Sequence, residues 1–147
     1  MRPARLILHL ALDEAPLAAG TVRRLARRVL IAEGVTGRVG VYAVGARVMA
    51  RLNRQLLGRR GATDVLTLCY NEGEPIPDPR QWRGEVWTCF AVARRQARRY
   101  GVTPAREWRR YLVHGLLHLA GYEHEGVNKR RAARMRARED FYLERTT

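Results

Sequence analysis

Three of the four histidines in the chain lie in the segment His114-Gly-Leu-Leu-His118-Leu-Ala-Gly-Tyr-Glu-His124. His114 and His118 are four residues apart, so on a helix their rings lie on one face about one turn apart. Two imidazoles at that spacing can bind one cation at about 2.0–2.1 Å each. Gly121 is expected to end the helix in a left-handed turn and to let the chain return with His124 as a third ligand.

This ligand set predicts hydrolytic chemistry. Three neutral histidines leave one position of a tetrahedral ion open to water, which becomes a source of hydroxide near neutral pH. The ion also polarises a phosphoryl or carbonyl oxygen. We expect one zinc-like ion, although imidazole also suits nickel, copper and iron. A closed structural site would need a fourth protein ligand, such as Cys69, Cys89 or Glu123, and the spacing of these residues does not indicate one.

The residues next to the histidines limit the kinds of hydrolysis that the site can catalyse. Gly115 stands where the metalloprotease motif HExxH has its catalytic glutamate, so peptide hydrolysis by that mechanism lacks its general base. Glu107 lies seven residues before His114, on the same helix face. It is either a carboxylate that orients an imidazole or a surface acid in the first turn of the helix. Glu123, next to His124, is a second candidate for an orienting carboxylate.

A helix with a defined start must hold this pair of histidines. Thr103-Pro104 supplies an N-cap residue and a proline for the first turn, and the helix is expected to run to about Ala120. Apolar residues at helical spacing and short apolar runs define the other elements. Strands are expected at 5–12, 39–44, 64–69 and 84–88, and helices at 21–32, 46–56, 90–100 and 128–144. Their alternation predicts an α/β (α+β) fold, in which helices pack on one four-stranded sheet.

Length and composition are typical of one globular domain. The chain has 147 residues with 46% hydrophobic side chains, so we expect a single domain over residues 1–147. No segment approaches the 18 apolar residues of a membrane span, and Asp13-Glu14 follow the first apolar run too soon for a signal peptide. Cys69 and Cys89 form no CxxC pair and are expected to be small buried residues. A reducing cytoplasm suits them.

The charge balance indicates a polyanionic partner. Lys and Arg total 28 against 14 Asp and Glu, a formal net charge of +14, and Lys129 is the only lysine. A genome rich in arginine codons would explain Arg over Lys but not the excess of cations over anions. Arg grips phosphate with two hydrogen bonds, and nucleic acid is the polyanion expected for this class of protein. The residues expected to hold an RNA backbone are Arg94, Arg95, Arg98, Arg99, Arg130, Arg131 and Arg134.

The histidine segment resembles the signature of the YbeY family, the bacterial rRNA maturation endoribonucleases. That pattern is His-Gly-x-Leu-His-Leu-x-Gly-Tyr-Asp-His, from which only Glu123 departs, by one methylene. Two further matches support the resemblance, which covers roughly residues 45–125. They are Leu52-Asn53 followed by Thr63-Asp64-Val65-Leu66, and Gly84-Glu85-Val86 leading to Gln96-Ala97.

The resemblance implies an α/β domain with a small, mostly parallel sheet and a single zinc held by His114, His118 and His124. It implies single-strand-directed RNA cleavage, maturation of 16S rRNA ends and ribosome quality control. The expected partner is the small ribosomal subunit with its rRNA. Neither a membrane nor a small-molecule cofactor is expected.

One departure from the family pattern affects the expected catalysis. Many members carry an arginine four residues after the asparagine that matches Asn53, and here that position is Leu57. Arg54, Arg59 and Arg60 lie nearby and are candidates to stabilise charge on the transferring phosphate, with Arg59 first because Gly58 lets the backbone bend there. Each is otherwise a solvated loop cation. Two alternatives stay open: a ribosome-assembly factor with a mainly structural zinc, and a metal hydrolase with a non-RNA substrate.

Overall fold

Four strands form one sheet in the spatial order β1-β2-β4-β3. The computed structural model of the chain describes residues 5–71, 74, 76–123 and 128–144. The strands are β1 (Leu6–Leu12), β2 (Gly37–Val44), β3 (Val65–Cys69) and β4 (Trp82–Cys89). β1, β2 and β4 run parallel, and β3 pairs antiparallel with β4 at the edge. The expected four-stranded, mostly parallel sheet is therefore confirmed.

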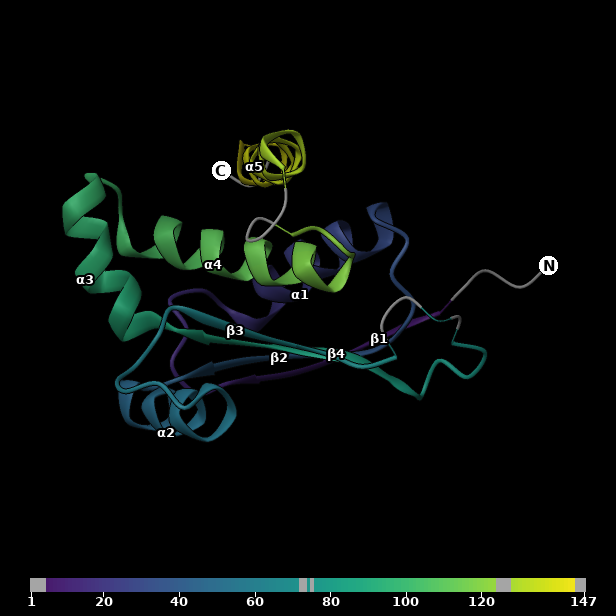
Figure 1. Cartoon of the computed structure of the whole chain (residues 1–147), viewed down its shortest axis with the longest axis horizontal. Coiled ribbons are helices and arrows are strands. Elements are labelled where there is room, and N and C mark those ends of the chain that lie inside the picture. Colours follow the sequence, from purple (N-terminus) through teal and green to yellow (C-terminus); the bar gives the residue numbers. More distant parts are fainter. Residues whose placement is uncertain (1–4, 72–73, 75, 124–127, 145–147) are drawn as a thin grey trace.

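The helices form layers on both faces of the sheet (Figure 1). They are α1 (Ala19–Ala32), α2 (Ala46–Leu57), α3 (Phe90–Tyr100), α4 (Pro104–Leu119) and α5 (Lys129–Glu144). α1 and α4 lie over one face with α3 beside them at one end, and α5 lies across the outer side of α4. α2 lies on the opposite face. The arrangement is the expected α/β fold, in which α4 is enclosed between the sheet and α5.

The apolar pattern of the sequence explains why these layers pack. In α1, Val22, Leu25, Ala26, Val29 and Leu30 are buried, as the helical spacing predicts. The central strands are buried on the face that meets α4. Burial of each large core side chain contributes roughly 1.5–3 kcal/mol to the stability of these layers.

Every expected element is present, and the bounds differ by at most two residues. α1, β2 and β4 each begin two residues earlier than expected, at Ala19, Gly37 and Trp82. Differences of this size are normal because element ends fray. The local sequence therefore determines the elements well, whereas the order of the strands in the sheet was not predicted and comes from the structure.

The two cysteines have different environments. Cys89 is buried, as expected, but Cys69 is exposed, so its predicted burial is wrong. Cys69 is the last residue of the edge strand β3, which pairs with β4 on one side only among the described strands. Within the described ranges, no helix combines the length and the apolar character needed to cross a bilayer.

Candidate functional site

Residues of helix α4 and its N-cap fix where the helix begins and how closely it packs against the sheet. The Thr103 side chain accepts a hydrogen bond from the backbone N–H of Arg106, and Pro104 occupies the first turn, as predicted. Gly115 lets the helix approach closely, because a Cβ at this position would lie 2.5 Å from Cγ1 of Val86 in β4. Gly115, which takes the place of the catalytic glutamate of the protease motif, is thus also the residue that lets α4 and its histidines pack closely on the sheet.

A buried polar chain fixes α4 laterally. The Trp108 indole N–H donates to Oγ1 of Thr88 at 3.0 Å, and the Thr88 hydroxyl donates to the carbonyl of Tyr42 at 2.9 Å. Trp108 and Thr88 are fully buried. Buried hydrogen-bonded groups specify one arrangement, since displacement would leave them unsatisfied. The helix carrying the histidines is therefore positioned relative to both β4 and β2.

His114 and His118 face each other across one turn of α4. Their Nε2 atoms are 3.0 Å apart, and the ring planes are inclined by 84°. The Nδ1 atom of His118 donates to the carbonyl of Tyr122 at 2.8 Å, and the Nδ1 atom of His114 contacts the carboxylate of Glu139 in α5. With an acceptor at each Nδ1, the proton of each neutral ring belongs there, which leaves lone pairs on both Nε2 atoms.

Two converging lone pairs repel each other unless a cation lies between them. A separation of 3.0 Å lets both nitrogens reach one ion at about 2.0–2.1 Å each. The donor set, two imidazoles with hydrogen-bonded Nδ1 atoms, therefore fits a zinc-like ion. The third predicted ligand, His124, lies outside the described residues. Among the residues that are described, no group of three His, Cys, Asp or Glu side chains is arranged to bind a metal.

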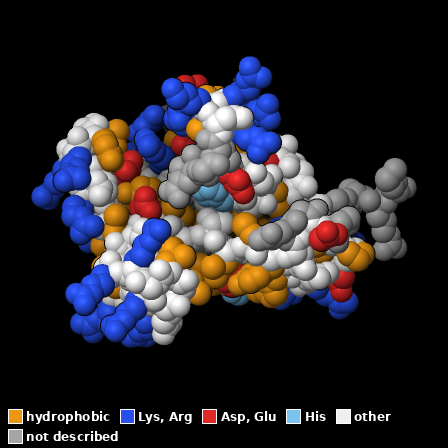
Figure 2. Space-filling view, in the orientation of Figure 1, with side chains coloured by type: hydrophobic (Ala, Val, Ile, Leu, Met, Phe, Trp, Pro, Cys, Tyr) orange, Lys and Arg blue, Asp and Glu red, His pale blue; other side chains and the backbone are white. Residues whose placement is uncertain are grey.

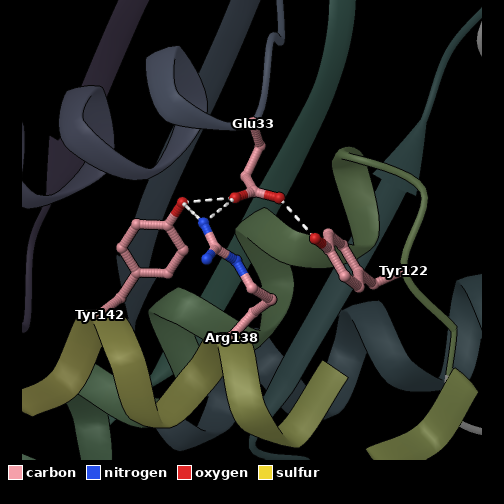
Figure 3. A network of polar contacts seen from close by, with 4 residues as sticks. All are labelled: Glu33, Tyr122, Arg138 and Tyr142. Atoms are coloured by element: carbon pink, nitrogen blue, oxygen red, sulfur yellow. Dashed lines mark hydrogen bonds and ion pairs between the residues drawn. The ribbon is translucent and has the colours of Figure 1, made fainter. Parts of the chain in front are cut away.

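Four residues from three parts of the chain form a polar cluster beside the turn after α4 (Figure 3). The Glu33 carboxylate, just after α1, accepts hydrogen bonds from the Tyr122 hydroxyl at 2.7 Å, from Arg138 at 2.7 Å and from the Tyr142 hydroxyl. We call these four residues the Glu33 cluster. Tyr122 also supplies the carbonyl that His118 contacts, so the cluster ties the turn after α4 to both α1 and α5.

The charge of Glu33 is stabilised within this cluster. Burial raises the pKa of Glu33, but the hydrogen bonds from Tyr142, Tyr122 and Arg138 outweigh burial and hold the pKa below its ordinary value of 4.5. Burial first, and then the hydrogen bond to Glu33, raise the pKa of Tyr122 and of Tyr142 and outweigh the opposite effect of Arg138. Glu33 is therefore an anion at neutral pH that fixes two neutral phenols and one guanidinium.

A cleft of about 630 Å³ runs along β3 past both histidines. We call it the β3 cleft. One of its walls includes Leu57, which is 51% exposed, and Arg59, while Glu123 contributes at the histidine end. Arg54 and Arg60 are exposed but do not line this cleft. The structure thus brings one of the three predicted arginines into the same cleft as the histidine pair.

The turn that bears Arg59 is held by the family motif residue Asn53. The buried Asn53 side chain donates to the carbonyl of Gly61 at 2.9 Å, which spans the turn. Gly58 has φ +65°, in the left-handed region, and ends α2. The predicted bend at Gly58 is therefore present, and it directs the chain so that Arg59 borders the β3 cleft.

A second cavity, of about 530 Å³, lies between the start of β3 and helices α3, α4 and α5. We call it the α3–α5 cavity. Glu107 lines it and is 4% exposed, so the alternative that Glu107 is a surface acid is wrong. The carboxylate that contacts a histidine ring is Glu139, which the sequence did not indicate. Among the described residues, Glu107 instead neighbours Tyr111, whose pKa is raised by burial and then by this carboxylate.

The spacing of Glu139 relative to the apolar residues of α5 could have indicated that its carboxylate is buried. Met135, Glu139, Tyr142 and Leu143 are the buried residues of this otherwise basic helix. They recur at intervals typical of the apolar face of a helix, so a carboxylate among them needs a buried partner. Because α5 is rich in basic residues, this buried face was not recognised from the sequence. The Tyr122 carbonyl and Glu33 had no comparable signal.

The arginines surround the site on several elements. Figure 2 shows Lys and Arg side chains gathered over α2, α3 and α5 around a central hollow in which a histidine is visible. All seven arginines predicted to hold RNA are exposed. Arg95 lines the α3–α5 cavity, and Arg131 and Arg134 line a hollow beside Tyr122 and Glu123. These positions suit contact with a phosphate backbone that passes the histidines.

The fold and the site together define a class of protein: a small α/β domain whose paired histidines lie on the helix over the antiparallel edge of the sheet. A family model described as endoribonuclease YbeY matches residues 13–147. The endoribonuclease YbeY of Pelotomaculum thermopropionicum is 38% identical over 88% of this chain and 86% of its own. The chain therefore belongs to the endoribonuclease YbeY family, which confirms the resemblance and the enzyme class predicted from the sequence.

Other comparisons agree. The endoribonuclease YbeY of Mycoplasma pneumoniae is 47% identical over 77 residues, an alignment that spans about half of each chain, 52% of this one and 49% of the relative. The solution structure of TM1509 from Thermotoga maritima has a TM-score of 0.64 with 24% identity, and the match covers 95% of this chain and 89% of that one. This likeness supports the fold.

Proposed function

We propose that this member of the family is a zinc-dependent endoribonuclease that cuts single-stranded rRNA in the β3 cleft, with the ends of 16S rRNA as its substrate. A role in ribosome quality control, a small-subunit partner and a cytoplasmic location follow from that substrate and are proposed with it. The observation that carries the proposal is the convergence of the two Nε2 atoms, 3.0 Å apart, in the cleft that Arg59 borders.

The chain's own residues have separate roles in this proposal. His114 and His118 hold the ion, and His124 is proposed as the third ligand. When bound, zinc supplies Lewis-acid polarisation of a phosphoryl oxygen and activation of water. Arg59 stabilises negative charge as it develops on the phosphate, and the exposed arginines of α3 and α5 hold the RNA backbone.

Metal-loaded full-length protein should cut a single-stranded fragment from the 3′ end of 16S rRNA. His118→Ala is expected to lower the cleavage rate by more than about 100-fold, since removing even a residue behind a metal ligand costs about 10–100-fold in affinity. His9→Ala is the matched control, because His9 is exposed on β1 outside the cleft. Retained zinc and retained cleavage in His118→Ala would contradict the proposal.

The products report the attacking group. Ends that carry a 2′,3′-cyclic phosphate indicate attack by the RNA 2′-hydroxyl, whereas direct attack by water leaves none. Mass spectrometry of the cut fragment distinguishes the two results.

Arg59 and Arg60 form an internal test of the cleft. Arg59→Ala is expected to lower cleavage by about 100-fold, the cost of losing a group that stabilises transition-state charge. Arg60→Ala removes the same charge one residue away, outside the cleft lining, and is expected to change cleavage little. Equal effects would show that both arginines act only through the general field of the surface.

Leu57 favours a second candidate function, a ribosome-assembly factor with little nuclease activity. This apolar side chain is 51% exposed in the β3 cleft at the position where many family members have arginine. A His114→Ala protein that stays folded by circular dichroism and still supports ribosome maturation would select this function. A non-RNA substrate would be indicated if zinc-loaded protein, verified by elemental analysis, leaves single-stranded RNA intact.

A further inference from the structure

The α3–α5 cavity adjoins the β3 cleft at His114. Both spaces are lined by His114 and by Thr63, Asp64 and Val65 at the start of β3. An RNA strand that lies in the β3 cleft with a phosphate at the histidine pair can therefore extend a neighbouring nucleotide into this cavity. Its volume of about 530 Å³ is within the usual range for small-molecule sites and exceeds what a single base requires.

The wall of the cavity contains buried polar atoms that lack partners among the described residues. Tyr111 is 5% exposed, and its hydroxyl makes no hydrogen bond of good geometry, although it lies close enough to the Glu107 carboxylate for that charge to raise its pKa. The Oε1 atom of Gln96 is also buried without a partner. Glu107, 4% exposed, lines the cavity beside Tyr111. Buried groups of this kind are normally satisfied, so their presence in the lining of one cavity, from both α3 and α4, indicates a polar occupant.

The remaining surfaces of the cavity suit the ring and the phosphate of a nucleotide. Val92 and Met135 are buried apolar wall residues, and Tyr100 is 61% exposed. An exposed aromatic ring stacks on any base. Three exposed arginines also line the space and can contact phosphates, namely Arg95, Arg110 and Arg136.

We infer that the α3–α5 cavity binds one nucleobase of the RNA substrate and selects guanine. The inference rests on the proposed ribonuclease function for its ligand. Glu107 offers two carboxylate oxygens to the N1–H and N2–H groups that only guanine presents side by side, and the Tyr111 hydroxyl donates to O6. Uracil presents a single donor between two acceptors, and cytosine and adenine have unprotonated ring nitrogens that would face the carboxylate.

Selection of a base in this cavity has a consequence for cleavage. A base held against Glu107 positions the adjoining phosphate near His114, because the same cavity includes that histidine. The enzyme then cuts single-stranded RNA next to guanine more often than next to other bases. The arginines contribute affinity without sequence preference.

Equilibrium binding tests the cavity without any cleavage. The four 5′-nucleoside monophosphates are titrated into zinc-loaded full-length protein by calorimetry. GMP is expected to bind about tenfold more tightly than UMP, and Glu107→Gln to remove about this factor, in line with one good bidentate base contact. The shared phosphate affects all four ligands equally, so the ratio reports the base. Tyr111→Phe is a second variant that keeps the packing and removes the donor.

Asp13→Asn is the control, since Asp13 is an exposed carboxylate in the turn after β1, outside the cavity. Equal affinity for all four nucleotides, or an equal change of GMP affinity in Asp13→Asn and Glu107→Gln, overturns the inference and leaves the cavity as a site for water. If Glu107→Gln does not fold by circular dichroism, Tyr111→Phe decides alone: unchanged GMP selectivity in that variant overturns the inference.

Sequencing of ends cut from a random-sequence single-stranded RNA separates this inference from the proposed function. Enrichment of guanine at one position beside the cut, reduced in Glu107→Gln, supports both. Cleavage without base preference, together with equal nucleotide binding, overturns the cavity inference and leaves the ribonuclease proposal standing. Selective GMP binding with no cleavage of any RNA supports the cavity and contradicts the ribonuclease proposal.

Discussion

His114 and His118 differ in what holds their rings, although they lie one turn apart on the same helix. The Nδ1 atom of His114 contacts a carboxylate from α5, 25 residues along the chain. The Nδ1 atom of His118 donates to the carbonyl of Tyr122, four residues on. One histidine therefore depends on the docking of a distant helix, and the other on a local turn. The helical spacing sets the distance between the rings, but it does not orient them.

The Glu33 cluster joins these two supports. Glu33 binds Tyr122 on one side and Arg138 on the other, and Arg138 precedes Glu139 in α5. The cluster therefore fixes the turn that serves His118 and the helix that serves His114. Glu139 contacts an imidazole directly, so we expect it to affect mainly the affinity for the metal. Within the part of the chain that the structure describes, Glu33 makes no hydrogen bond to a histidine and links secondary-structure elements, so we expect it to affect mainly the free energy of unfolding. Variants of Glu139 and Glu33 should separate these two effects.

Replacement of Glu139 should have the largest effect. Glu139→Ala is expected to raise the zinc dissociation constant by about 100-fold, and Glu139→Gln by about tenfold, because the amide oxygen still accepts from the imidazole. Competition with a chromophoric chelator measures both constants. Asp140→Asn, at the next and exposed position, is the control. Equal zinc affinity in Glu139→Ala and Asp140→Asn would show that the carboxylate does not support the metal site.

Replacement of Glu33 should lower the free energy of unfolding more than it lowers the affinity for zinc. Glu33→Gln is expected to lower the free energy of unfolding by about 2 kcal/mol, since it weakens the charge-assisted bond to Arg138 and the bonds from two phenols. Zinc affinity should fall less than in Glu139→Gln. Urea unfolding and the same chelator assay measure the pair. A Glu33→Gln protein of wild-type stability that has lost zinc binding would contradict this division.

Acid titration should sharpen the role of Glu33. A carboxyl whose native pKa lies below its unfolded value stabilises the fold above that value, and the stabilisation is lost as the pH falls through the native pKa. The hydrogen bonds that lower the pKa of Glu33 below 4.5 thus contribute fully at neutral pH. The difference in unfolding free energy between wild type and Glu33→Gln should shrink below pH 4.5. A difference that is constant down to pH 3 would exclude this origin.

Tyr122→Phe should have the smallest effect. It removes one hydrogen bond to Glu33 but keeps the backbone carbonyl that His118 contacts. We expect a loss of about 1 kcal/mol in unfolding free energy, the usual net value of such a bond, and unchanged zinc affinity. A marked loss of zinc would mean that the phenol, and not only the carbonyl, determines the orientation of His118.

Local chemistry explains how much could be predicted from the sequence. The start of α4 at Thr103-Pro104, the bend at Gly58 and the histidine pair all depend on neighbours within a few residues, and each was predicted correctly. Glu139 was missed because its partner is 25 residues away and its helix is mostly basic. The burial of Glu107 was missed because it depends on α3 and α5 closing a cavity around it.

The amino-acid sequence by itself determined the helices and strands, the excess of positive charge and the spacing of His114 and His118, because each follows from side-chain types and short-range geometry. Only the tertiary structure decided which acceptors orient the two imidazoles, that Arg59 and not Arg60 borders their cleft, and that Glu107 and Tyr111 share a cavity. The partner of His114 and the cavity around Glu107 and Tyr111 arise from contacts between elements that are far apart in the chain, whereas the contact of His118 with Tyr122 depends on how the turn after α4 folds. Such contacts form through burial and packing, which no local pattern of residues encodes.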